Sequence, residues 1–154
     1  MMKKEGKSKA STILPVPRTK KEAKQFYDRI SRFYDLTGAI ERKYAQRALD
    51  YLSIRQRETV LEIGFGTGYC LQRMAEQVGP MGRACGIDIS SGMLQLATRR
   101  LEKAGLLDRT ELCCGDAAFL PYREDTFNAP FMSFTLELFD TPEIPIVLEE
   151  VKRV

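Results

Sequence analysis

The spacing of hydrophobic residues divides the chain into segments of two kinds. Apolar side chains recur at every third or fourth position over 20–36 and again over 40–53, which predicts two helices near the start. Further along, short apolar runs alternate with segments of helical spacing, and Gly or Pro residues separate them. The predicted strands are 59–63, 83–88, 110–114 and 127–134, and the helices beside them are 69–78, a segment that Ser90 or Ser91 caps and Gly105 ends, and a final segment that Pro142 and Pro145 introduce.

This alternation predicts an α/β fold. Strands that alternate with helices of about 10–15 residues are joined by right-handed crossovers and form a parallel sheet, with helices on both faces. The predicted organisation is a tail over 1–21, N-terminal helices that cover a pocket over 22–58, and an α/β domain over 59–154.

The last predicted helix reaches the final residue without a glycine cap. Two of its apolar residues, Val151 and Val154, fall in the last four positions as part of an unburied apolar stripe. We therefore expect the front part of a longer fold, an incomplete domain with only the first four strands of its sheet. The segment 127–134 is then an exposed apolar edge, which favours self-association. Pro130 within it suits an edge position because proline lacks a ladder donor.

The positive charge of the chain is concentrated at its start. Residues 1–21 hold seven lysines and arginines against one glutamate, so this segment carries +6 and the remainder −3 in a net charge of +3. The pattern predicts a disordered, solvated tail, with weak contact to anionic lipid or nucleic acid as the alternative and no specific nucleic-acid partner. No apolar stretch approaches the roughly 20 residues that a membrane helix needs.

The chain has four cysteines and no histidine. The cysteine spacings match no zinc pattern, so no metal site is predicted. Cys85 and Cys113 lie in strand-like runs, which predicts buried reduced thiols and a cytoplasmic location. Because histidine is the commonest general base, its absence leaves the catalytic residue unknown.

The most specific chemical signal is the segment 60–68, Val-Leu-Glu-Ile-Gly-Phe-Gly-Thr-Gly. Glycines at the alternate positions Gly64, Gly66 and Gly68 let the backbone turn sharply and let a ligand approach the main chain. The acid Glu62 would repel the pyrophosphate of a dinucleotide and attract a ligand with an ammonium and a sulfonium group. S-adenosylmethionine carries both groups.

A nicotinamide or flavin dinucleotide is the competing ligand for such a loop. Its fingerprint, Gly-x-Gly-x-x-Gly/Ala, ends in a small residue that permits close packing of helix and strand. Tyr69 occupies that position here, and the third glycine comes one place earlier. The loop therefore favours S-adenosylmethionine.

Two further acids follow predicted strands, where ligands bind in open parallel sheets. Asp88 closes 83–88 and could accept hydrogen bonds from both hydroxyls of a ribose, and Asp116 follows 110–114 and could accept from an adenine amino group. Taken singly, the glycine loop could be a tight connection, Asp88 a helix cap and Asp116 a turn residue. Their order and spacing together favour one shared ligand site.

With these motifs the chain resembles a class I S-adenosylmethionine-dependent methyltransferase, and within that class the ubiquinone/menaquinone-biosynthesis type. The resemblance spans roughly 22–154 and implies a Rossmann-like fold. The chain departs from the family pattern at Asn128, where the family usually has an acid. The resemblance rests on Tyr-Asp-Arg-Ile-Ser-Arg-Phe-Tyr-Asp (27–35), Val60 to Gly68, Gly-Ile-Asp-Ile-Ser (86–90), Gly-Asp-Ala (115–117) and the stretch Phe127 to Val154 with Ser-Phe-Thr-Leu-Glu (133–137).

The resemblance implies roles for the matching residues. Tyr27, Tyr34 and Thr135 would contact the substrate, with helix packing as the alternative for the two tyrosines and core packing for Phe134. The implied cofactor-binding residues are Glu62, Gly64, Gly66 and Gly68 at the methionine part, Asp88 at the ribose, Ile89 and Met93 against adenine, Asp116 and Ala117 at the adenine edge, and Phe134 near the transferable methyl.

The expected function is methyl transfer from S-adenosyl-L-methionine to a small-molecule acceptor, with a quinol-like lipophilic ring as the candidate. The reaction needs an acceptor in line with the methyl and the sulfonium, and it can proceed by proximity and orientation in a dry pocket. The alternative is a non-catalytic S-adenosylmethionine-binding fragment, or a subunit that needs a partner for its C-terminal half.

Overall fold

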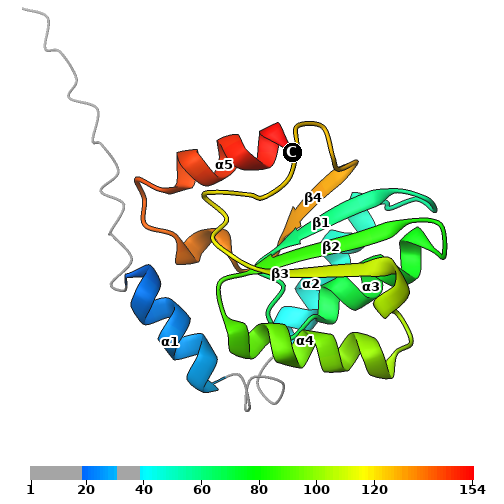
Figure 1. Cartoon of the computed structure of the whole chain (residues 1–154), viewed down its shortest axis with the longest axis horizontal. Helices are drawn as coiled ribbons and strands as arrows, with labels where there is room; N and C mark the ends of the chain where they lie inside the picture. Colours follow the sequence, from blue (N-terminus) through cyan, green and yellow to red (C-terminus); the bar gives the residue numbers. More distant parts are fainter. Residues whose placement is uncertain (1–18, 31–38) are drawn as a thin grey trace, which may run out of the picture.

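A computed structural model describes residues 19–30 and 39–154 (Figure 1). Residues 1–18 of the predicted tail lie outside this part, as does Tyr34, and the first helix begins at Lys20. None of the helices in the two described ranges is both long and apolar enough to cross a membrane. The elements are α1 (Lys20–Ile30), α2 (Ala39–Leu52), β1 (Thr59–Ile63), α3 (Tyr69–Val78), β2 (Arg83–Asp88), α4 (Ser91–Lys103), η2 (Leu107–Arg109), β3 (Thr110–Cys114), β4 (Ala129–Met132), η3 (Leu136–Leu138) and α5 (Ile144–Arg153).

The four strands form one parallel sheet in the order β3-β2-β1-β4. β1 pairs on both sides, so that Leu61 lies opposite Cys85 of β2 and Pro130 of β4. Successive residues of β1 point into two cores. Val60 packs among residues of α2, α3 and α4, whereas Leu61 packs on the other face with Val147 of α5. Helices therefore cover both faces (Figure 1), which confirms the predicted α/β architecture.

β4 is shorter than the predicted 127–134. Phe134 has a φ of 53°, a left-handed conformation that cannot continue a strand. Before the strand, Asn128 donates its N–H to the carbonyl of Thr59 at 2.8 Å, and its side-chain oxygen accepts the N–H of Thr59 at 2.7 Å. β4 pairs with β1 alone within the described sheet, so its edge position is confirmed, and Pro130 is exposed there.

The end of α5 is buried, so the expectation of an unburied apolar stripe is wrong for its last turn. Val147 is fully buried and Val154 is 5% exposed, because both pack against the sheet. The carbonyl of Val154 accepts the N–H of Phe127 at 2.8 Å, and the guanidinium of Arg153 donates to the carbonyl of Tyr122 at 2.7 Å. These bonds tie the helix end to the loop before β4.

Gly68 occupies a position where α3 and α4 approach too closely for a side chain. Its φ is 77°, and a Cβ there would lie 2.8 Å from the Cβ of Ala97 and 3.0 Å from its Cα. We expect Gly68→Ala to lower the free energy of unfolding by roughly 2–5 kcal/mol, because left-handed strain and overpacking add. Urea-induced unfolding measures the loss.

Gly105→Ala is the matched control for this substitution. Gly105 also has a left-handed φ, 68°, but nothing lies within 4 Å of the place that a Cβ would occupy. Only the backbone strain applies, so we expect a loss of about 1–2 kcal/mol. Equal losses in the two variants would contradict a packing role for Gly68.

Candidate functional site

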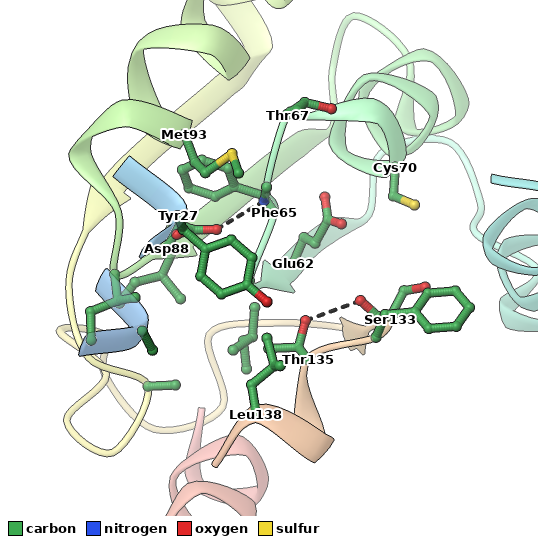
Figure 2. Close-up of a pocket in the computed structure, with 18 of the residues that line it drawn as sticks. Tyr27, Glu62, Phe65, Thr67, Cys70, Asp88, Met93, Ser133, Thr135 and Leu138 are labelled. Atoms are coloured by element: carbon green, nitrogen blue, oxygen red, sulfur yellow. Dashed lines mark hydrogen bonds between the residues drawn. The ribbon is translucent and has the colours of Figure 1, made fainter. Parts of the chain in front are cut away.

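A pocket opens at the carboxyl ends of the four strands, where the sequence predicted a ligand site (Figure 2). Its wall comes from the segments that follow the strands and from α1 and α2. Gly68 is not part of this wall, since it lies at the contact of α3 with α4. The predicted site residues in the wall are Tyr27, Glu62, Gly64, Gly66, Asp88, Ile89, Met93, Asp116, Ala117, Phe134 and Thr135.

The loop after β1 turns at glycines that adopt left-handed backbone conformations. The φ angles of Gly64 and Gly66 are 73° and 51°. The N–H of Gly64 donates to the carbonyl of Ile87 at 2.7 Å, which holds the loop against β2. A Cβ on Gly64 would overlap the side chain of Thr135. Glycine is therefore required here by the fold of the loop itself.

Asp88 ends β2 and is 9% exposed. Its Oδ2 accepts the N–H of Gly66 at 2.8 Å, and its Oδ1 accepts the N–H of Ser90 at 2.8 Å. Burial raises the pKa of Asp88, and the two N–H donors oppose this shift. The side-chain cap of α4 is Ser90, whose hydroxyl accepts the N–H of Met93 at 3.1 Å. Asp88 thus fixes the glycine loop, and its carboxyl group has further lone pairs beyond these two hydrogen bonds.

Glu62 is buried in β1 and only 3% exposed. Its carboxyl meets the first turn of α3 through the N–H of Leu71 and the thiol of Cys70. Its Oε2 has no hydrogen-bond partner among the described residues. Burial, and secondly the charge of Asp88, raise the pKa of Glu62 well above its ordinary value. A cationic group in the pocket would partner Oε2 and stabilise the ionised form.

Asp116, after β3, already has partners in this structure. Its Oδ2 pairs with Nζ of Lys20 at 2.7 Å, and its Oδ1 accepts the N–H of Ala118 at 3.0 Å. Lys20 also pairs with Glu143 at 2.9 Å. Asp116 therefore acts as a turn residue, which was the alternative role, and it forms an ion pair with Lys20 of α1. Its contact with adenine stays a prediction.

The two residues that follow Ser133 differ in their exposure. Thr135 is 7% exposed, and its hydroxyl donates to the carbonyl of Ser133 at 3.0 Å. Phe134 is 46% exposed, so core packing, the alternative for this residue, is wrong. A left-handed φ of 53° is rare for a bulky residue and shows that the surroundings hold the backbone. Phe134 thus contributes an apolar ring to the pocket wall.

Asp28 anchors α1 beside the pocket and was not predicted as a site residue. Its Oδ1 accepts the hydroxyl of Ser90 at 2.6 Å and the N–H of Gly92 at 2.9 Å, both at the start of α4, and its Oδ2 pairs with Lys24 at 2.8 Å. Desolvation, the largest contribution, raises the pKa of Asp28, but hydrogen bonds from Lys24, Ser90 and Gly92 lower it to about 2. The only sequence signal was its place in the Tyr27–Asp35 run.

This anchor places Tyr27, the residue before it, in the pocket. Figure 2 shows the hydroxyl of Tyr27 pointing into the pocket on the side of Glu62 and Thr135. On the opposite wall, the carbonyl of Thr67 in the glycine loop accepts a hydrogen bond from Nε of Arg100 in α4 at 2.8 Å. The loop, α1 and α4 are thus connected around the pocket.

The chain matches the family profile described as a methyltransferase domain over residues 60–154. This range contains the glycine loop, Asp88 and Asp116. The chain belongs to the methyltransferase domain family. Its four-stranded parallel sheet has the Rossmann-like class I architecture that the motifs predicted, and membership of the family confirms that resemblance.

Similarity to known methyltransferases extends beyond the family domain. A demethylmenaquinone methyltransferase of Symbiobacterium thermophilum is 29% identical over 146 residues, which are 91% of this chain and 57% of the relative. A SAM dependent methyltransferase structure from Aquifex aeolicus is 27% identical with a TM-score of 0.69, covering 82% of this chain and 66% of that one. The [4+2]-cyclase SpnF, 21% identical with a TM-score of 0.77 over 89% of this chain and 56% of that one, shares the fold. The chain spans about half the length of the curated relatives it matches.

Proposed function

We propose that this methyltransferase domain binds S-adenosylmethionine and transfers the methyl group to a small-molecule acceptor. The observation that carries the proposal is the pair of buried carboxyl groups beside the glycine loop. Glu62 presents an oxygen without a protein partner among the described residues, and Asp88 lies on the neighbouring strand at the same edge of the sheet. The pair suits a ligand that has an ammonium group at one end and ribose hydroxyls further along.

In this proposal, different residues of the pocket bind different parts of the cofactor. The cofactor supplies an electrophilic methyl group on a positively charged sulfur. Glu62 accepts from the ammonium group, and Gly64 and Gly66 leave room for the methionine part beside the backbone. Asp88 accepts from the ribose hydroxyls, and Met93, which is 2% exposed, packs against the adenine ring. Because the two acids fix the ligand at two points, they set the direction in which the methyl group faces.

The proposed acceptor is a lipophilic ring of the quinol type. Relatives that match most of this chain are named demethylmenaquinone methyltransferases. The wall beyond the glycine loop contains Tyr27, Phe134, Thr135, Leu138 and Phe139, and its aromatic rings could stack on a planar acceptor. Proximity and orientation in such a pocket speed transfer without a protein nucleophile.

Two further properties complete the proposal. Among the described residues β4 pairs with β1 alone, and such an edge favours pairing with another strand, so we propose self-association through β4. The cysteines are free thiols rather than disulfides in this structure, which supports a reducing, cytoplasmic location.

A labelled methyl-transfer assay tests the proposed function. The chain is incubated with S-adenosylmethionine labelled in the methyl group and a demethylated naphthoquinol, and the label in the organic phase is counted. We expect transfer in the wild type and strongly reduced transfer in Asp88→Ala. Calorimetric binding of S-adenosylhomocysteine without transfer to the quinol or to a lipid extract would support the non-catalytic alternative, and absence of binding would overturn the proposal.

A further inference from the structure

Polar contacts near both ends of α1 hold this helix against the segments that follow β2 and β3. Near its start, Nζ of Lys20 pairs with Oδ2 of Asp116 at 2.7 Å and with Glu143 at 2.9 Å. Near its end, Oδ1 of Asp28 accepts the hydroxyl of Ser90 at 2.6 Å, and Figure 1 shows α1 beside the start of α4. The helix therefore contacts both segments that contain the acids proposed for the adenosine part of the cofactor.

The contact at Asp28 continues toward the proposed ribose site through Ser90. The same Oδ1 of Asp28 also accepts the N–H of Gly92 at 2.9 Å, so one oxygen holds two groups at the start of α4. The N–H of Ser90 donates to Oδ1 of Asp88 at 2.8 Å, and Oδ2 of Asp88 accepts the N–H of Gly66 at 2.8 Å. Ser90 thus connects α1 with Asp88 and, beyond it, with the glycine loop.

Burial and charge make this connection strong. Ser90 is fully buried and Asp88 is 9% exposed, and hydrogen bonds strengthen where water is excluded. Desolvation raises the pKa of Asp28, but hydrogen bonds from Lys24, Ser90 and Gly92 lower it to about 2. Asp28 is therefore ionised near neutral pH, and a charged acceptor forms shorter and stronger hydrogen bonds than a neutral one.

A ligand that donates two ribose hydroxyls to Asp88 needs this carboxyl group in one orientation. The hydroxyls lie on neighbouring carbon atoms, so both reach a single carboxylate only when that group faces them. The N–H groups of Ser90 and Gly66 set the orientation of Asp88, and Asp28 fixes the turn that contains Ser90. Without Asp28, the turn between β2 and α4 loses its contact with α1, and the orientation of Asp88 is less restricted.

We propose that Asp28 is a positioning residue for the cofactor, which orients Asp88 through Ser90 so that the ribose site is complete only when α1 is docked. This inference rests on the proposed function, in which Asp88 binds the ribose hydroxyls. Asp28 does not itself line the pocket. The affinity that it contributes should therefore depend on the hydroxyl groups of the ligand, and a ligand that lacks one of them should be less sensitive to the loss of Asp28.

Calorimetry with two ligands tests this assignment. S-adenosylhomocysteine and its 3′-deoxy analogue, which lacks one ribose hydroxyl, are titrated into the wild type, Asp28→Ala and Asp28→Asn. Asp28→Ala should weaken binding of S-adenosylhomocysteine by about 10-fold and binding of the analogue by only about 2-fold, because the coupling involves the missing hydroxyl. Asp28→Asn retains one side-chain oxygen for Ser90 and Gly92, so it should recover part of the loss.

Two lysines of α1 provide matched controls. Lys24→Met removes the partner of Oδ2 of Asp28 at 2.8 Å and leaves both contacts of Oδ1 in place. Lys21→Met changes an exposed lysine of the same helix. Both variants should bind the two ligands as the wild type does. A loss in Lys24→Met equal to that in Asp28→Ala would assign the effect to the ion pair and overturn the connection through Ser90.

The two ligands separate orientation of Asp88 from simple covering of the pocket. Equal weakening of both ligands by Asp28→Ala would show that α1 only covers the pocket, and this result would overturn the inference. Unchanged affinity for S-adenosylhomocysteine would overturn it as well. Both results leave the proposed function intact because the wild type still binds its ligand. If the wild type binds neither ligand, the proposed function fails and the inference fails with it.

Discussion

Asp88→Ala is expected to weaken S-adenosylmethionine binding by about 100-fold or more, since hydrogen bonds to a charged group contribute roughly 1.5–3 kcal/mol each. The substitution removes the charged acceptor proposed for the two ribose hydroxyls. It also releases the N–H groups of Gly66 and Ser90, which the carboxylate holds at 2.8 Å. The glycine loop and the start of α4 thereby lose a shared anchor. Calorimetric titration with S-adenosylhomocysteine measures the effect.

Two further variants show whether the loss arises in the binding site. Asp88→Asn keeps one side-chain oxygen and the shape of the side chain, so its affinity should fall between those of the wild type and Asp88→Ala. Asp108→Ala removes an exposed acid of η2 that does not line the pocket, and this variant should bind as the wild type does. Unchanged affinity in a folded Asp88→Ala protein would refute the role of Asp88.

Glu62→Gln is expected to weaken cofactor binding by about 10–100-fold, because the ammonium group loses a charged partner.

The same variant should be as stable as the wild type, or more stable, near neutral pH. Burial raises the pKa of Glu62 above the ordinary 4.5, so the folded chain retains a proton that the unfolded chain releases. Wild-type stability therefore falls as pH rises above that value, and glutamine removes this contribution. Asp88, whose pKa is also raised, contributes in the same direction and remains in the variant.

Cofactor binding should also depend on the ionisation of Glu62. An ammonium group favours ionised Glu62, so cofactor binding should release a proton, and wild-type affinity should increase as pH rises through the raised pKa of Glu62. Calorimetry in two buffers of different ionisation enthalpy counts the proton. In Glu62→Gln the proton release should disappear, whereas Glu149→Gln, at an exposed position of α5, should retain it. Equal proton release in Glu62→Gln would exclude Glu62 as the group that titrates.

Much of this pocket could be predicted from the sequence because its parts are local. A left-handed turn needs glycine at defined positions, and Gly64, Gly66 and Gly68 all have positive φ. The position of Asp88 follows from its place at the end of an apolar run, because parallel strands end at one edge of the sheet. The sequence pattern predicts Gly68 as a ligand contact, although the close approach of Ala97 in α4 explains this glycine. That approach depends on how two helices pack, which no local pattern contains.

By itself, the sequence determined the α/β architecture, the glycine loop and the two acids beside it, since each depends on residues a few positions apart. Only the tertiary structure shows which side chains from distant segments lie together around the glycine loop. It placed Asp28 on the start of α4, Lys20 on Asp116 and Arg42 over Tyr69. The spacing of apolar residues defines the buried face of a helix, but the partner and the angle follow from the packing of the whole core. The positions of Asp28, Lys20 and Arg42 beside the pocket could therefore be found only from the tertiary structure.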